Sequence, residues 1–299
     1  VVLAIATPFA LKLIGGFDQM FVLLDTNYFE PMGDLSIWLI IIYASTGLTI
    51  LVEPTFYQRI FAAKSYKNVR NALVAGIFIW GAYDWIITIL AMAAKVGTLQ
   101  GIIDPSIEPD AALLTIMVTA LPAGVLGLFL AGVLATEMST LDSYCLVAGG
   151  NVAYDVYRPL AKKEVPDTQL IRTTRYGIVL SWVLGFGMAI AFEQMLGLWV
   201  FMASILISSV TIPIIFGLYI KNFRKPMAGL LSAGLGLLST IILNVLVMSR
   251  GVFLGEEETY VLQLGRWEIM QEYIMYFTVP ISLMGFFIGL LIDKGKNYE

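Results

Sequence analysis

One run of nine residues near the middle of the chain carries side chains that could hold and move an ion. Residues 135–143 read Ala-Thr-Glu-Met-Ser-Thr-Leu-Asp-Ser and close a long apolar stretch. The run provides four hydroxyls and two carboxylates, on Thr136, Ser139, Thr140, Ser143, Glu137 and Asp142. Hydrocarbon tolerates such groups only when they face a cavity, a partner or an ion, so the run is a candidate functional site.

The spacing of these hydroxyls predicts that they share one face of a helix. Ser139, Thr140 and Ser143 follow i, i+3 and i+4 intervals, and the backbone carbonyl near Thr136 falls on the same face. Neutral oxygens grouped in this way suit a hard alkali cation better than a transition metal. The run therefore predicts ion-coupled transport.

The composition is that of a membrane protein. Hydrophobic residues make up 59% of the 299 residues and charged residues 13%, against about 25% charged in a soluble domain. The chain has no histidine and one cysteine, Cys145, which excludes a His-ligated zinc or haem and a disulfide within the chain. No basic domain is present, so we expect no nucleic-acid partner. We also expect no catalytic residues and no enzymatic activity.

Apolar runs of about 20 residues predict the helices that position the candidate site. A partial span is expected at 1–14, and seven full spans at 35–61, 70–96, 121–145, 173–192, 195–220, 226–249 and 272–292. A short helix at 109–119 is expected to precede the fourth full span, which continues as a helix to about Pro159. The chain opens on Val1, without Met and already apolar, so we expect a fragment of a longer membrane protein.

The charged residues predict the orientation of these spans. Fourteen of the 18 basic residues fall on one side if the spans alternate, namely Arg59, Lys64, Lys67, Arg70, Arg158, Lys162, Lys163, Arg172, Arg175, Lys221, Arg224, Lys225, Lys294 and Lys296. The opposite loops carry Asp18, Asp25, Glu30, Asp34, Asp104, Glu108, Asp110 and the acidic run 256–258. The positive-inside rule places the basic side and the C-terminus in the cytoplasm.

The span at 35–61 is expected to be broken. Ser45, Thr46, Gly47 and Thr49 loosen it, and Pro54 then removes a backbone donor. Such an interruption at membrane depth indicates a transporter binding site, although an ordinary proline kink would look the same. Glu53 beside it strengthens the functional interpretation, and the alternative is a simple ion pair with Arg59.

The next span carries an acidic residue at membrane depth. Asp84 lies between Tyr83 and Trp85, and Trp80 precedes it by one turn. Asp84 is a functional candidate by default, and its alternative role is to accept a hydrogen bond from a neighbouring helix. The three aromatic residues more often contact lipid or pack against helices than bind substrate.

Two motifs give the chain a family resemblance. Tyr57-Gln58-Arg59-Ile60-Phe61-Ala62-Ala63-Lys64-Ser65 follows the broken span, and Met138-Ser139-Thr140-Leu141-Asp142-Ser143 is followed by Asp155-Val156-Tyr157-Arg158-Pro159. Both resemble signatures of the sodium:solute symporters, which include sodium/glucose, sodium/proline and sodium/pantothenate carriers. The resemblance covers most of the chain up to about residue 225.

This resemblance implies an all-α integral membrane protein with a leucine-transporter-type fold, in which two inverted repeats of five helices hold solute and ion at the midplane. On that mapping, 1–299 is a single transmembrane transporter domain. Residues 1–14 end the first repeat, 35–220 form the second, and 226–292 add two peripheral helices. The rest of an N-terminal first repeat of the same protein would be missing.

The resemblance also implies roles for residues. The coupling ion would be Na⁺, held by the Thr136 carbonyl and the Ser139 and Thr140 hydroxyls, with further carbonyls from the first repeat. The solute-binding candidates are Glu53, Thr55, Tyr57, Trp80 and Asp84. The candidates for coupling or gating are Pro54, Glu137, Asp142 and Ser143.

Two of these positions depart from the family pattern. Trp80 lies near the position of a substrate-contacting lysine of one sugar carrier, which argues against a sugar. Glu137 stands where the family has a small or apolar residue. It binds a cationic solute, replaces an ion by protonation, or pairs with a basic residue of the first repeat.

The sequence therefore predicts a secondary active transporter of the plasma (inner) membrane. It would couple Na⁺ to the uptake of a small organic solute by alternating access, in contact with membrane lipid. One alternative is proton coupling through Glu53, Asp84, Glu137 and Asp142, whose carboxyl pKa values burial would raise. Another is a membrane sensor module of the same fold, joined to a signalling domain.

Overall fold

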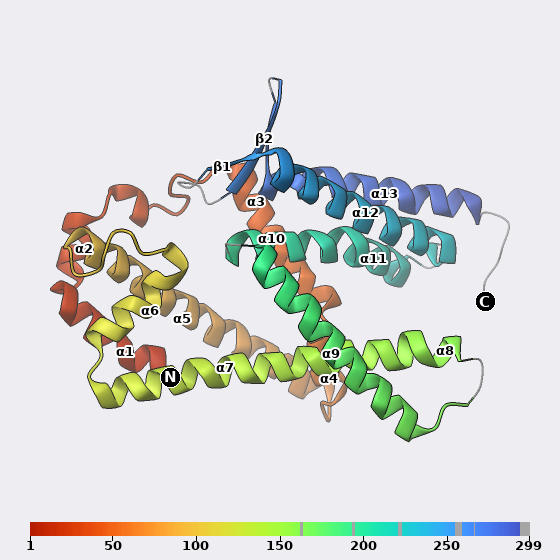
Figure 1. Cartoon of the computed structure of the whole chain (residues 1–299), viewed down its shortest axis with the longest axis horizontal. Coiled ribbons are helices and arrows are strands. Elements are labelled where there is room, and N and C mark those ends of the chain that lie inside the picture. Colours follow the sequence, from red (N-terminus) through yellow and green to blue (C-terminus); the bar gives the residue numbers. More distant parts are fainter. Residues whose placement is uncertain (162–163, 193–194, 221–222, 255–258, 266, 294–299) are drawn as a thin grey trace. The chain divides into compact units, whose positions relative to one another are not determined.

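The computed structural model describes residues 1–299 except 162–163, 193–194, 221–222, 255–258, 266 and 294–299 (Figure 1). Its contacts divide the chain into two compact units. Unit 1 comprises residues 1–33 and 55–186, and unit 2 comprises residues 34–54 and 187–299. The second repeat expected at 35–220 and the peripheral pair at 226–292 stay predictions.

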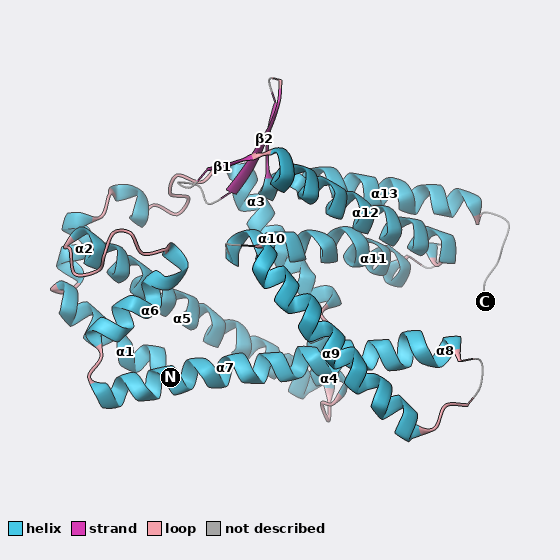
Figure 2. Ribbon diagram, in the orientation of Figure 1, coloured by secondary structure: helices cyan, strands magenta, loops and turns pink. Residues whose placement is uncertain are grey.

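The expected spans are confirmed as helices. Six are long and apolar enough to cross a membrane, or up to eight if each of two broken helix pairs is one span, within the part of the chain described. Figure 2 shows that helix dominates and that strands are confined to one small sheet. Several charges used for the orientation lie outside the described residues, namely Lys162, Lys163, Lys221, Lys294, Lys296 and the run 256–258.

Unit 1 is built around an apolar core between its first helices and two later ones. Its elements are α1 (Val2–Ile14), α2 (Phe17–Leu23), η1 (Thr26–Phe29), α4 (Pro54–Phe61), α5 (Tyr66–Leu99), α6 (Pro109–Ala120), α7 (Ala123–Gly150), η3 (Asn151–Tyr157), α8 (Arg158–Leu160) and α9 (Asp167–Ala191), whose last turns belong to unit 2. Ala6, Ala10 and Ile14 of α1 are buried against α5 and α6. The Gln100 amide donates to the Ile14 carbonyl at 2.9 Å and so satisfies the last turn of α1.

The helix that carries the hydroxyl run is long and continuous. Pro122 precedes the first residue of α7, a position that suits a residue without a backbone donor, and α6 ends at Ala120, as expected from Leu121-Pro122. The helix then continues through the π-helical turns of η3 into α8, which ends at Leu160. The expected extension of this helix to about Pro159 is confirmed.

Two glycines let α7 and α9 cross at close range. A Cβ at Gly149 would lie 2.5 Å from the Thr174 carbonyl oxygen, and one at Gly177 would lie 2.9 Å from the Gly149 Cα. Small residues allow this approach, which matters in a membrane because lipid gives no hydrophobic drive for helices to associate.

We expect Gly149→Ala to lower the free energy of unfolding by about 1–3 kcal/mol, because the added methyl group meets backbone that cannot move aside. Gly150→Ala is the matched control, since a Cβ there meets nothing within 4 Å. Thermal unfolding of the two variants in detergent measures the difference. Equal stabilities would contradict the close crossing.

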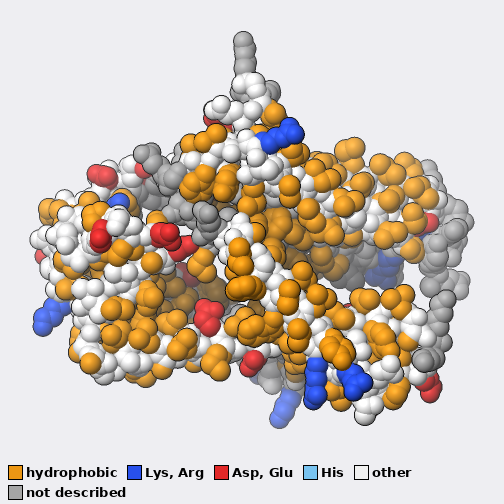
Figure 3. Space-filling model, viewed as in Figure 1, with side chains coloured by type: hydrophobic (Ala, Val, Ile, Leu, Met, Phe, Trp, Pro, Cys, Tyr) orange, Lys and Arg blue, Asp and Glu red, His pale blue; other side chains and the backbone are white. Residues whose placement is uncertain are grey.

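Unit 2 rests on a pair of helices packed through small residues. Its elements are α3 (Ile37–Thr46), η2 (Gly47–Val52), α10 (Met195–Ile205), η4 (Leu206–Thr211, a π-helix), α11 (Ile212–Tyr219), α12 (Pro226–Arg250), β1 (Val252–Leu254), β2 (Thr259–Leu264), β3 (Trp267–Met270), η6 (Gln271–Tyr273) and α13 (Ile274–Ile292). A Cβ at Gly289 of α13 would lie 2.4 Å from the Ala228 Cα of α12, and the Ser232 and Ser282 hydroxyls are 2.9 Å apart. Apolar side chains cover the visible outer faces of both helices (Figure 3).

The segment after α12 contains a sheet that the sequence analysis did not predict. Strands β1, β2 and β3 form an antiparallel sheet in that order, with Val252 opposite Val261 and Gln263 opposite Glu268. Thr259 and Val261 of β2 are buried, as period-2 alternation requires. The spans are helical as expected, and this sheet is an addition to them.

Candidate ion and solute sites

The hydroxyl residues of α7 form one connected group, which we call the hydroxyl cluster: Thr136, Ser139, Thr140 and Ser143. The Thr136 carbonyl accepts hydrogen bonds from the Ser139 hydroxyl at 2.9 Å and from the Thr140 hydroxyl at 3.0 Å. The Ser143 hydroxyl donates to the Ser139 carbonyl at 3.0 Å. The expectation that these oxygens share a helix face is confirmed.

These bonds fix what the hydroxyl oxygens can still do. A hydroxyl has one proton and two acceptor lone pairs, and here each proton is donated to the backbone of the same helix. The oxygen lone pairs of Ser139 and Thr140 therefore remain available to a cation. The donor set of neutral hydroxyl and carbonyl oxygens fits Na⁺ and does not fit a soft transition metal.

The cluster is exposed on the surface of unit 1. Every residue from Val133 to Asp142 is exposed, and Ser143 is half-buried. Glu137 and Asp142 are on the same exposed segment. Among the residues that the structure describes, no group of three or more His, Cys, Asp or Glu side chains is arranged to hold a metal. The hydroxyls, rather than a carboxylate cage, are the oxygen ligands that α7 offers.

The break in the second predicted span lies at Glu53 and Pro54. The helix changes from α to 3₁₀ at Gly47, Glu53 is extended with φ −73° and ψ 110°, and α4 starts at Pro54. The loosening residues donate to their own helix, as the Thr49 hydroxyl does to the Thr46 carbonyl at 2.7 Å. The predicted break is confirmed.

The remaining solute candidates flank this break or lie on α5. Thr55 and Tyr57 are half-buried in the first turn of α4, where the Tyr57 ring lies 5.9 Å from that of Phe61. Trp80 and Asp84 are both exposed on α5, and the Asp84 carbonyl accepts a hydrogen bond from Thr88 at 2.9 Å. Within the described part of unit 1, no hydrogen bond or ring contact joins Trp80 or Asp84 to the hydroxyl cluster.

A cavity of about 680 Å³ in unit 1 lies further along α7, and the sequence analysis did not predict it. It is lined by Gln58 of α4, by the last turns of α7, by Asn151 and Asp155 of η3, and by Thr174 and Arg175 of α9. Gln58 and Asp155 belong to the two motifs that carry the family resemblance, so the motifs meet at one cavity. The cavity lies beside the π-helical turns of η3, and such turns are frequent at functional sites. The sequence analysis could not use this signal, because a π-helical turn is not encoded by a simple residue pattern.

Several long apolar helices, one of them broken within its apolar stretch and another carrying a cluster of cation-compatible oxygens, are the features of a membrane transport protein. A family model agrees with this class, since that of the sodium:solute symporter family matches residues 13–236. The chain belongs to this family of sodium-coupled solute transporters. Searches of curated proteins and of solved structures gave no match.

We expect Asn151→Cys to be labelled by a membrane-impermeant thiol reagent only from the cytoplasmic side, because Asn151 lines the cavity and the basic residues nearby predict that side. The background is Cys145→Ala, which removes the one native thiol. Ser106→Cys, in the acidic loop between α5 and α6, is the matched control and should react only from outside. Labelling of both variants from the same side would contradict the orientation.

Proposed function

We propose that this chain couples Na⁺ entry to the uptake of a small organic solute. The observation that carries the proposal is the geometry of Thr136, Ser139 and Thr140, whose oxygens gather around one carbonyl with their protons directed into the helix. Family membership supports the same assignment, because the family is sodium-coupled. Transport, rather than an enzymatic reaction, is the activity that it implies.

In the proposed mechanism, external Na⁺ binds the Ser139 and Thr140 hydroxyl oxygens, takes the place of their hydrogen bonds at the Thr136 carbonyl, and stabilises the outward-open state. Alternating access then releases ion and solute to the cytoplasm. One charge that moves inward through 100 mV supplies about 2.3 kcal/mol, before any contribution from the concentration gradient. Because a hydroxyl ligand carries no charge, Na⁺ can leave once the geometry opens.

The solute is proposed to bind near the broken span. Unwound backbone at Glu53 and Pro54 leaves groups that a polar solute can use, with Thr55 and Tyr57 on the adjoining turn. Trp80 and Asp84 of α5 are the further solute candidates. Glu137, Asp142 and Ser143 lie next to the ion ligands on α7, so we assign them, with Pro54, to coupling or gating.

The exposed face of α7 needs a covering structure in the membrane, because exposed hydroxyls and carboxylates do not face lipid at membrane depth. We propose that helices of the first repeat of the same protein provide it, together with the remaining carbonyl ligands for Na⁺. We further propose a plasma (inner) membrane location with a cytoplasmic C-terminus, on the basis of the charge distribution.

In the double variant Ser139→Ala with Thr140→Ala, the Na⁺ concentration that gives half-maximal uptake should rise at least tenfold. This rise corresponds to about 1.4 kcal/mol of binding free energy, and it is expected because two of the three proposed chain ligands are lost. The measurement is sodium-dependent uptake by the full-length protein in vesicles, screened over amino acids, sugars and carboxylates. Thr119→Ala is the matched control, since its exposed hydroxyl also donates to a carbonyl one turn earlier, at 2.8 Å, but lies on α6.

Two results would overturn the sodium assignment. One is a double variant whose uptake needs the same Na⁺ concentration for half-maximal rate as that of the Thr119→Ala control. The other is uptake that a pH gradient drives fully in sodium-free buffer, which would favour proton coupling through the carboxylates instead.

A further inference from the structure

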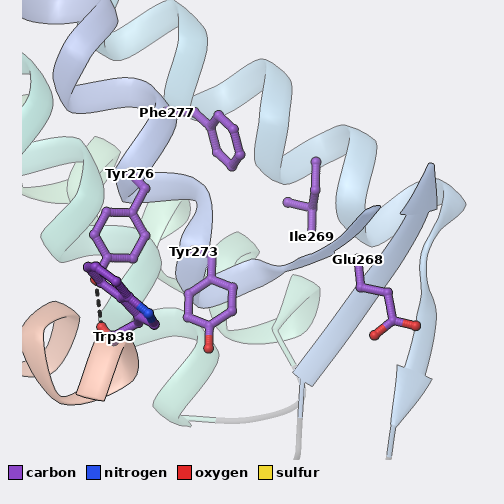
Figure 4. Close-up of a pocket in the computed structure, with 6 residues that line it drawn as sticks. All are labelled: Trp38, Glu268, Ile269, Tyr273, Tyr276 and Phe277. Carbon is purple, nitrogen blue, oxygen red and sulfur yellow. Dashed lines mark hydrogen bonds between the residues drawn. The ribbon is translucent and has the colours of Figure 1, made fainter. Parts of the chain in front are cut away.

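A second pocket, wholly within unit 2, has a different chemistry from the hydroxyl cluster. It has a volume of about 320 Å³ and lies where α3, β3, η6 and the start of α13 meet (Figure 4). Its lining, which we call the aromatic pocket, consists of Trp38, Glu268, Ile269, Tyr273, Tyr276 and Phe277. The volume is within the range of small-molecule sites, about 300–1,000 Å³.

Three of the rings form a continuous aromatic surface. The Trp38 and Tyr276 centroids are 6.1 Å apart in an edge-to-face arrangement, and those of Tyr273 and Tyr276 are 6.0 Å apart. Trp38 is 61% exposed and Tyr276 is 38% exposed, so ring faces remain open to a ligand. An aromatic face is the negative end of the ring quadrupole and attracts cations.

The polar groups of the aromatic pocket are few and mostly engaged. The Tyr276 hydroxyl donates to the Trp38 carbonyl at 2.7 Å, and the Tyr273 hydroxyl is hydrogen-bonded to Ser36 at 3.2 Å. Among the described residues of the lining, Glu268 supplies the one carboxylate, and it accepts a long hydrogen bond of 3.4 Å from Gln263. These described residues include no basic side chain, so they carry a negative charge.

From these contacts we infer that the aromatic pocket binds a quaternary ammonium group. Such a cation needs aromatic faces but no hydrogen-bond acceptors, and the pocket offers three rings. Glu268 adds a negative charge at the far side of the same pocket, where its carboxylate points away from the rings (Figure 4). A sugar would need several directional partners, and the described lining offers only two tyrosine hydroxyls that are already hydrogen-bonded within the protein and one carboxylate.

Hydrogen bonds join the elements that carry the lower part of the pocket lining, β3 and η6, to strand β2. The buried Thr259 hydroxyl of β2 donates to the buried Glu272 carboxylate of η6 at 2.7 Å. The pairing of Gln263 with Glu268 fixes the register of β3 on β2. These contacts tie β2 to β3 and η6 beside the pocket, and the pocket goes beyond the proposed sodium and solute sites, since it uses none of their residues.

The test is calorimetric titration of the full chain in an uncharged detergent with tetramethylammonium chloride, against sodium chloride at the same ionic strength. We expect saturable binding of tetramethylammonium that weakens roughly two- to thirtyfold in Trp38→Leu and in Glu268→Gln. Trp182→Leu is the matched aromatic control, since Trp182 is 59% exposed on α9, and Glu30→Gln is the carboxylate control. Both controls should bind as the unaltered chain does.

The source of the ammonium group is then decided in lipid nanodiscs. Weaker tetramethylammonium binding in phosphatidylcholine discs than in discs of phosphatidylethanolamine, which has the same net charge but no quaternary ammonium, would identify a lipid headgroup as the occupant, and equal binding would identify a free solute. The inference is overturned if binding does not saturate, as expected of aromatic side chains that only anchor the protein at the membrane surface. It is also overturned if Glu268→Gln and Trp38→Leu, both still folded by circular dichroism, bind as tightly as their controls.

Discussion

The structure depends on one constraint, which is that each polar group in a helix meant for hydrocarbon must find a partner inside the protein. Hydroxyls on α5, α7, α9 and α12 meet it in the same way, by donating to a carbonyl three or four residues earlier, as Thr88, Thr140, Thr174 and Thr240 do. Among the described residues, no buried side-chain nitrogen or oxygen lacks a hydrogen-bond partner. A Ser or Thr can therefore lie in an apolar helix with little loss of stability. The lone pairs of its exposed hydroxyl oxygen then remain able to bind a cation or to accept another hydrogen bond.

The same constraint separates structural hydroxyls from the proposed ion ligands. In unit 2, the Ser208 and Thr278 hydroxyls are 2.7 Å apart and both side chains are buried, so they hold helices together where glycines allow close contact. In unit 1, Ser139 and Thr140 share a single carbonyl and face outward from α7. A structural hydroxyl pair satisfies itself across two helices, whereas an outward-facing pair leaves acceptors that need a cation or another part of the protein.

The sequence predicted the spans, the break at Pro54, the short helix before Pro122 and the shared face of the hydroxyl cluster, because each depends on local rules of length, backbone geometry or spacing. It did not predict the sheet of β1, β2 and β3, whose strands are short and follow a helix without a strong alternating pattern. Nor could it predict either pocket. The cavity beside η3 brings Gln58 and Arg175 together from distant helices, and the aromatic pocket brings Trp38 to Tyr276 across more than half of the chain. The leucine-transporter-type fold and the sodium and solute residues remain predictions from the family resemblance.

The two proposed cation sites differ in the way that their chemistry requires. A small ion of high charge density must exchange its water shell for oxygen ligands, so it needs hydroxyls and carbonyls whose lone pairs are free, as at Ser139 and Thr140. A large alkylated ammonium spreads its charge over methyl groups and is weakly hydrated. Oxygen ligands therefore contribute little to its binding free energy, and aromatic faces contribute more. Trp38, Tyr273 and Tyr276 would therefore discriminate against Na⁺, and the hydroxyl cluster would discriminate against the ammonium. One chain can accordingly hold both kinds of cation without competition between the sites, because charge density, and not charge alone, selects the occupant of each.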